Sequence, residues 1–296
     1  MTGVAVALSG IGAADAAIIH RTPGTDEFGA PIWGEGPTQP DMMSATLVPN
    51  SSGLVPRGVN NWQCRSDRDP VVLVPGTVGS AYASFSFIGP QLVDAGYCVY
   101  SFNHNPISFL PALSFSGDIA ESAEMLGVFV DHVLAQTGST KVTLLGQSQG
   151  GGMLPLYYMN FLGGADKVSA LIGLTPTNHG TTLNLPITLD KNILRGAEQL
   201  FGFVGNGQSL PQQWVGSDIN DKIYNNGPVT RPGIKYTMIA TADDTLVTPY
   251  TNCFIWEPGV TNILIQDRFP GKSISHVDTM YDQQVMSLLL EALAQV

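Results

Sequence analysis

Residues Lys141 to Gly152 read KVTLLGQSQGGG, and this stretch decides the fold. The apolar, partly β-branched run that begins at Val142 has the composition of a strand buried in a parallel sheet. It leads into GQSQG, residues Gly146 to Gly150, and a helical pattern begins at Met153. A G-x-S-x-G between a strand and a helix predicts a nucleophile elbow, a strained turn that exposes the serine hydroxyl. Ser148 is therefore the predicted nucleophile, although the pentapeptide alone would also fit a glycine-rich loop with a solvated serine.

The composition of the chain indicates how many domains it forms and which kinds of partner it can bind. Its 296 residues are 44% hydrophobic, which is enough for one sizeable core, and α/β folds of this length commonly form one domain. The net charge is −11 with only 13 Lys plus Arg, so nucleic acid and anionic membrane surfaces would be repelled. The chain has no apolar run of about eighteen residues, and we expect no membrane-spanning helix. A charged fraction of 12% with abundant Gly and Pro is typical of extracellular hydrolases.

The first sixty residues differ from the rest because they show no sustained period. Val4 to Ile19 is Ala-rich and fits either the remainder of a secretion signal or an amphipathic or disordered tail. Pro and Gly supply about a third of the positions from Thr22 to Asn60, as expected of an irregular arm. Leu54 to Gly58 reads LVPRG, which resembles an engineered thrombin site, so no functional role is expected for it. We predict an irregular arm over residues 1–60 and one catalytic domain over residues 61–296.

From Asp69 onward, short apolar runs alternate with longer stretches of helical period. This alternation predicts an α/β fold with a mostly parallel sheet and helices on both faces. Asp118 is expected to cap a long helix that stops before Gly138. The predicted strands are 71–74, 97–102, 142–145, 168–174, 234–240 and 261–265, and the predicted helices are 84–95, 118–136, 150–161, 191–204 and 278–294.

Between residues 176 and 232 the alternation lapses into a long insertion with one predicted helix, over residues 191–204. The apolar residues of this helix fall on one face: Ile193, Leu194, Ala197, Leu200, Phe201 and Val204. Such a stripe usually packs into a core. Because the insertion follows the strand after the elbow, the stripe could instead cover the mouth of the site as a lid, which would favour an apolar substrate.

A serine hydroxyl needs a base to remove its proton, and the base needs a carboxylate to fix its tautomer. With this elbow, the acid is expected after a later strand and the histidine after the last strand. Asp243 and Asp244 follow the strand predicted at 234–240, and His276 follows the last predicted strand. Adjacent side chains point in different directions, so only one of the two aspartates can reach the imidazole, and the other would cap a turn.

The oxyanion of an acyl-transfer intermediate needs hydrogen-bond donors that are already in place. The residue after the nucleophile, Gln149, would give one main-chain N–H. The loop Gly76 to Gly79, read GTVG, follows the strand that ends at Pro75 and is the natural source of the second donor. Thr77 in that loop could also donate through its hydroxyl. The alternative for the loop is a plain glycine turn.

These residues resemble the secreted bacterial triacylglycerol lipases and esterases of the α/β-hydrolase fold, and more distantly Candida antarctica lipase B. The resemblance covers about residues 61–296. Its matching stretches are 61–64 (NWQC), 71–85 (VVLVPGTVGSAYASF), 96–102 (GYCVYSF), 146–150 (GQSQG), 176–181 (PTNHGT), 244–250 (DTLVTPY) and His276.

The resemblance implies several residue roles. In that family the aspartate that begins D-x-x-V-x-P is the triad acid, which favours Asp244 over its neighbour, and the threonine after PG is an oxyanion donor, which favours Thr77. A cysteine before the first matched strand is bridged to one in the next strand. This would pair Cys64 with Cys98 and leave Cys253 without a partner.

The leading hypothesis is a secreted, monomeric carboxylic ester hydrolase, a lipase or esterase that acts on acylglycerols or similar apolar esters through an acyl-enzyme on Ser148. An acyltransferase would use the same triad. A non-catalytic binding module on this fold is the alternative from a different class, because a fold does not determine a function. We expect no cofactor, no metal and no nucleic-acid partner, and transient contact with a lipid interface is compatible with the predicted lid.

Overall fold

A six-stranded sheet organises the computed structural model, which describes residues 22–186 and 189–296, so that Val4 to Ile19 lies outside the described residues. The strands are β3 (Val71–Val74), β4 (Val99–Ser101), β5 (Val142–Gln147), β6 (Val168–Leu174), β7 (Lys235–Ala240) and β8 (Val260–Leu264). They lie in the order β4-β3-β5-β6-β7-β8, and each neighbouring pair is parallel. The predicted α/β fold with a parallel sheet is confirmed.

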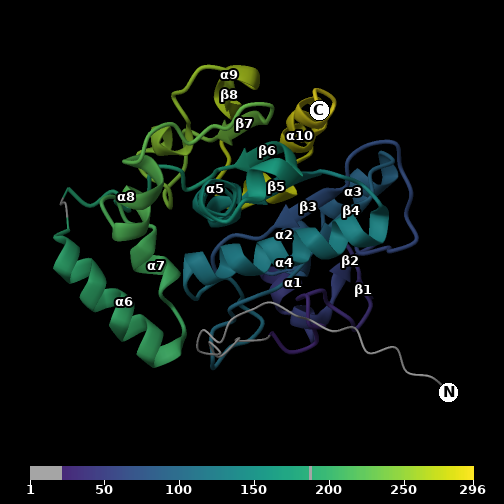
Figure 1. Cartoon of the computed structure of the whole chain (residues 1–296), viewed down its shortest axis with the longest axis horizontal. Coiled ribbons are helices and arrows are strands. Elements are labelled where there is room, and N and C mark those ends of the chain that lie inside the picture. The colour runs from purple at the N-terminus through teal and green to yellow at the C-terminus, as the bar shows by residue number, and fades with distance from the viewer. Residues whose placement is uncertain (1–21, 187–188) are drawn as a thin grey trace.

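Helices cover both faces of this sheet. They are α2 (Ala81–Phe85), α3 (Ile88–Asp94), α4 (Ile119–Thr137), α5 (Met153–Phe161) and α10 (Gln283–Leu293). Because successive side chains of a strand point to opposite faces, Val72 and Val74 join a core with α4 and α5, while Val71 and Leu73 join a second core with α3 and α10. Figure 1 shows α4 and α5 on the near side of the strands. In the described parts of the chain, none of the helices is both long and apolar enough to span a membrane.

The long helix α4 begins and ends as its sequence predicts. The Asp118 carboxylate accepts hydrogen bonds from the N–H groups of Ala120 and Glu121 at its first turn. Gly138 ends it with a φ of 77°, in the left-handed region that glycine enters without a steric penalty.

Two other predicted helices are interrupted in the structure. The segment predicted at 84–95 contains the end of α2 and all of α3, with a break at Ser86 and Phe87. The break occurs because Pro90 has no N–H to donate to the Ser86 carbonyl in a continuous helix. The segment predicted at 278–294 begins as a short 3₁₀ helix, and α10 starts only after Asp282. The Asp282 carboxylate caps α10 by accepting from two N–H groups of its first turn.

The described residues of the insertion between β6 and β7 form three helices, and the expectation of a single helix was wrong. They are α6 (Lys191–Gly205), α7 (Ser209–Gln212) and α8 (Asp218–Tyr224). The two additional helices have four and seven residues, too few for a hydrophobic period to reveal them. Figure 1 shows α6 in green at the edge of the molecule, away from the sheet. Leu200 and Phe203 of α6 are 60% and 92% exposed, so its apolar residues do not form an ordinary core.

The described part of the N-terminal arm, residues 22–60, has more structure than its sequence predicted. It contains β1 (Glu35–Gly36), α1 (Met42–Thr46), a 3₁₀ helix (Ser51–Gly53) and β2 (Val55–Pro56). Elements this short have no detectable period. Val55 and Val59 are buried in the core that contains α3 and α10, and Arg57 makes two hydrogen bonds with Asp94. The LVPRG stretch is therefore packed as part of the fold.

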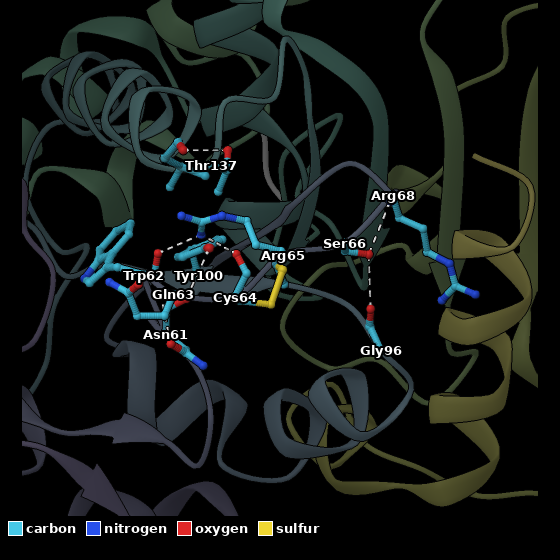
Figure 2. The surroundings of a disulfide bond; sticks show 12 residues. Asn61, Trp62, Gln63, Cys64, Arg65, Ser66, Arg68, Gly96, Tyr100 and Thr137 are labelled. Carbon is cyan, nitrogen blue, oxygen red and sulfur yellow. Dashed lines mark hydrogen bonds between the residues drawn. A yellow bond between two sulfur atoms is a disulfide. The ribbon is translucent and has the colours of Figure 1, made fainter.

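A disulfide joins Cys64 to Cys98 (Figure 2), and the pairing implied by the family resemblance is confirmed. Beside it, the Arg65 guanidinium donates hydrogen bonds to the main-chain carbonyls of Trp62 and Cys64. The Trp62 ring stacks on Tyr100 of β4 with 4.9 Å between the ring centroids. The segment that leads into β3 is thus anchored by a covalent bond to the residue before β4 and by aromatic packing to β4 itself.

Candidate active site

Ser148 lies where β5 meets a 3₁₀ helix, Ser148–Gly151, that leads into α5. Its φ of 55° is in the left-handed region, which is unfavourable for a residue other than glycine. A Cβ atom on Gly146 would meet the carbonyl oxygen of Gly150 at 1.8 Å, and one on Gly150 would meet the Val74 carbonyl oxygen at 2.2 Å. Only glycine permits these approaches. The turn therefore has the geometry of a nucleophile elbow.

His276 and Asp244 form a buried pair near the carboxyl end of the sheet. His276 Nδ1 lies 2.7 Å from Asp244 Oδ2, and the two side chains are 4% and 0% exposed. The other carboxylate oxygen accepts hydrogen bonds from the N–H groups of Leu246 and Val247, each at 2.8 Å. A carboxylate held in this way keeps the proton of a neutral imidazole on Nδ1, which leaves Nε2 free to accept a proton.

The neighbouring aspartate, Asp243, has different partners. Its Oδ2 accepts a hydrogen bond from the N–H of Ile274 at 3.0 Å, and its own N–H donates to the Thr241 hydroxyl at 3.2 Å. Asp243 therefore ties the loop after β7 to the segment that precedes His276. Of the two adjacent aspartates, Asp244 is the one hydrogen-bonded to the imidazole.

A cavity of about 580 Å³ is lined by Ser148, His276 and Thr77 together. Its volume is within the range of about 300–1,000 Å³ that is common for small-molecule sites. Most of the wall is apolar and comes from the insertion and nearby loops: Leu183, Leu189, Ile193, Leu194, Ala197, Phe201, Leu210, Trp214, Leu246 and Val247. Part of the apolar stripe of α6 therefore faces the site, as the lid hypothesis requires.

The loop after β3 passes very close to the nucleophile. A Cβ atom on Gly76 would meet the Gln147 carbonyl oxygen at 2.9 Å and the Ser148 Cβ at 3.0 Å. Val78, two positions later, has a φ of 56°, which is rare for a β-branched residue and indicates backbone strain. As the second residue of its 3₁₀ helix, Gln149 has an N–H that this helix does not use. Of the two predicted oxyanion donors, Gln149 directly follows Ser148, and Thr77 lines the same cavity as Ser148.

Two further residues connect to the site without a sequence signal. Thr175, with a φ of 44°, lies between the elbow and the histidine loop, because its hydroxyl accepts from Gln147 Nε2 at 3.3 Å and donates to the His276 carbonyl at 3.4 Å. Gln213 lines the cavity and donates to the Thr77 hydroxyl oxygen at 2.6 Å. It lies in the part of the insertion that has no periodic pattern, so sequence reasoning had no means of finding it.

Comparison with known proteins gives the same fold. Residues 69–206 match the family model described as alpha/beta hydrolase fold. Aspergillus fumigatus lipase B is similar with a TM-score of 0.64 and 20% identity, over 81% of this chain and 55% of that chain. The mature form of Bacillus licheniformis lipase BlEst2 is similar with a TM-score of 0.57 and 17% identity, over 78% and 94% of the two chains.

A further similar structure is MGS-MChE2, an alpha/beta hydrolase enzyme from the metagenome of lagoon sediments at Mar Chica, Morocco. Its TM-score is 0.51 at 18% identity, over 78% of this chain and 93% of that chain. The chain spans only 55% of the length of the Aspergillus lipase. The resemblance to lipases and esterases drawn from the sequence is confirmed at the level of the fold, which is the α/β-hydrolase fold.

Proposed function

We propose that this chain, which has the α/β-hydrolase fold, is a serine-dependent carboxylic ester hydrolase. In this proposal Ser148 is the nucleophile, His276 the general base and Asp244 the carboxylate that orients the base. The observation that carries the proposal is the 2.7 Å hydrogen bond between the buried side chains of His276 and Asp244, at a cavity that Ser148 also lines. A binding module would have no need for such a pair beside a strained serine.

The reaction would proceed in two steps. His276 Nε2 takes the proton of Ser148 Oγ as this oxygen attacks the ester carbonyl carbon, and the oxyanion accepts hydrogen bonds from Thr77 and from the main-chain N–H of Gln149. His276 then gives the proton to the departing alcohol, which leaves an acyl group on Ser148. Water, activated by the same histidine, attacks the acyl-enzyme and releases the acid. This chemistry requires no cofactor and no metal.

The cavity supports esters with an apolar acyl chain, such as acylglycerols, as substrates. Its wall is made mostly of Leu, Ile, Phe and Trp side chains, and burial of apolar surface contributes about 25 cal/mol per Å². Leu200 and Phe203 are exposed on α6, the helix of the insertion that contributes Ile193 and Phe201 to this wall. We propose transient contact of this surface with a lipid interface. The Cys64–Cys98 disulfide supports an oxidising compartment and hence secretion.

A fluorophosphonate probe tests the proposal, because it reacts covalently with an activated serine. Labelling should map to Ser148 and be absent in Ser148→Ala. Ser287→Ala is the matched control, since Ser287 is exposed on α10 and does not line the cavity. Hydrolysis of p-nitrophenyl esters with C2 to C16 acyl chains would then give the substrate class, and added alcohol would reveal acyl transfer. A folded protein that neither labels nor hydrolyses any ester would be a binding module.

A further inference from the structure

We propose that Gln213, a residue of the insertion, is a positioning residue that directs the Thr77 hydroxyl proton into the cavity. The inference rests on the proposed function and adds to it a residue that acts on the oxyanion donor. It assigns the insertion a part in catalysis beyond lining the substrate wall.

The Thr77 hydroxyl oxygen accepts hydrogen bonds from two glutamine side chains. Its oxygen lies 2.6 Å from Gln213 Nε2 and 3.2 Å from Gln149 Nε2. A hydroxyl group has two acceptor lone pairs and one proton. Two N–H donors occupy both lone pairs, so the proton must point in the remaining direction. Because Thr77 lines the cavity, this proton is available to a substrate oxygen.

The polarity of this arrangement depends on which end of each amide faces Thr77. Gln213 Nε2 also donates to the main-chain carbonyl of Ser209 at 3.0 Å, and Gln149 Nε2 donates to that of Phe115 at 3.2 Å. A carbonyl oxygen can only accept, so the NH₂ end of each amide must face its carbonyl. The same nitrogen carries the second N–H toward Thr77. The two carbonyls therefore determine that Thr77 receives hydrogen bonds from both glutamines.

The shorter of the two bonds comes from the insertion. Gln213 follows α7 directly, and its side-chain oxygen accepts from the Thr177 hydroxyl at 3.1 Å. Its main-chain carbonyl accepts from the N–H of Thr181 at 2.9 Å. Gln213 is 6% exposed, so little water can compete for its hydrogen bonds. One well-held amide thus links the insertion to the oxyanion loop.

Two substitutions of Gln213 distinguish loss of the hydrogen bond to Thr77 from reversal of its donor and acceptor. Gln213→Leu removes the N–H at similar size. Gln213→Glu keeps the shape, but a carboxylate only accepts, so it would draw the Thr77 proton away from the substrate. With p-nitrophenyl butyrate we expect kcat to fall about 10-fold for Gln213→Leu and about 10²- to 10³-fold for Gln213→Glu, with KM changed by less than about 3-fold.

Gln212→Leu is the matched control. Gln212 is the preceding residue and is 4% exposed, but its amide bonds to Asp118 and to the N–H of Ile119 and it does not line the cavity. This variant should lower Tm and keep the wild-type kcat. If Gln213→Leu also lowers Tm and leaves kcat unchanged, Gln213 is only structural and the proposal is overturned.

A double-mutant cycle with Thr77 tests whether the effect passes through the hydroxyl. Thr77→Val removes the hydroxyl at nearly constant shape, so adding Gln213→Leu to it should lower kcat by no more than about 2-fold. Losses that multiply would overturn the proposal. In Thr77→Ser, which keeps the hydroxyl, Gln213→Leu should still lower kcat.

Labelling of Ser148 by the fluorophosphonate probe distinguishes the two proposals. A wild-type protein that neither labels nor hydrolyses overturns both of them. A wild-type protein that hydrolyses, with unchanged kcat in Gln213→Leu, overturns the positioning role alone.

Discussion

Replacing Asp244 by asparagine should inactivate the protein while leaving it folded. Asp244 Oδ1 accepts from the N–H groups of Leu246 and Val247, and these groups can only donate. The amide oxygen of asparagine must therefore take this place, which turns its NH₂ toward His276 Nδ1. An N–H donor there forces the imidazole to carry its proton on Nε2, the atom that has to accept the proton of Ser148.

The size of the effect follows from this change of tautomer. A triad carboxylate replaced by its amide typically lowers kcat by about 10⁴-fold, which corresponds to about 5.4 kcal/mol at 1.36 kcal/mol per tenfold change in rate. Stability should change little, because both main-chain hydrogen bonds are kept. Asp243→Asn is the matched control: its amide oxygen can still accept from Ile274, so kcat should be unchanged and the free energy of unfolding should fall by no more than about 1 kcal/mol.

The assay is kcat for p-nitrophenyl butyrate, with thermal unfolding followed by circular dichroism for both variants. If Asp244→Asn keeps kcat within about tenfold of wild type, Asp244 does not set the tautomer of His276, since a wrong tautomer could not support that rate. An inactive Asp243→Asn beside an active Asp244→Asn would transfer the role to Asp243. It would also show that the buried pair with His276 is structural.

The remaining predictions concern the other triad residues and the cysteines. Ser148→Ala and His276→Ala should each lower kcat by about 10⁶-fold without unfolding the protein, measured as p-nitrophenolate release; a variant with near wild-type turnover would lose its place in the triad. Ellman's reagent without reductant should find no reactive thiol in the native protein, because burial raises the pKa of the Cys253 thiol. After denaturation it should find one thiol. Three thiols would contradict the disulfide. Cys98→Ala should lower the free energy of unfolding by about 3–4 kcal/mol in urea titrations, since the Cys64–Cys98 bridge has a sequence separation of 34 residues; an unchanged midpoint would show that the bridge does not stabilise the fold.

The sequence predicted those features that depend on residues close together in the chain. The elbow at Ser148 could be predicted because its motif is contiguous in the chain: Gly146 is required by a contact within the turn, whereas Gly150 is required by a contact with Val74 of β3. The helix over α4 was equally predictable, since its capping residues Asp118 and Gly138 act on their own first and last turns. The order along the chain of the six strands of the large sheet followed from the alternation of short apolar runs with helical periods.

Elements with a weak local pattern could not be predicted from the sequence. The short elements of residues 22–60 and the helices α7 and α8 have no period long enough to detect. Pro90 indicates the break before α3. The apolar pattern on both sides of Pro90 nevertheless led to the prediction of one continuous helix. For the short elements, packing against the rest of the molecule, and not local preference, determined the structure.

Only the tertiary structure decided which side chains meet. Asp244 and His276 are 32 residues apart, and Thr77 and Gln213 are 136 residues apart. By itself the sequence left two adjacent aspartates open, and only the family resemblance preferred one of them. The structure distinguishes the two, because Asp244 alone makes hydrogen bonds with Leu246, Val247 and His276. A carboxylate bonds only to donors that the folded chain brings within about 3 Å. The role of Gln213 could not be predicted from the sequence, since it depends on hydrogen bonds to Thr77, Ser209 and Thr177, which only the folded chain brings together.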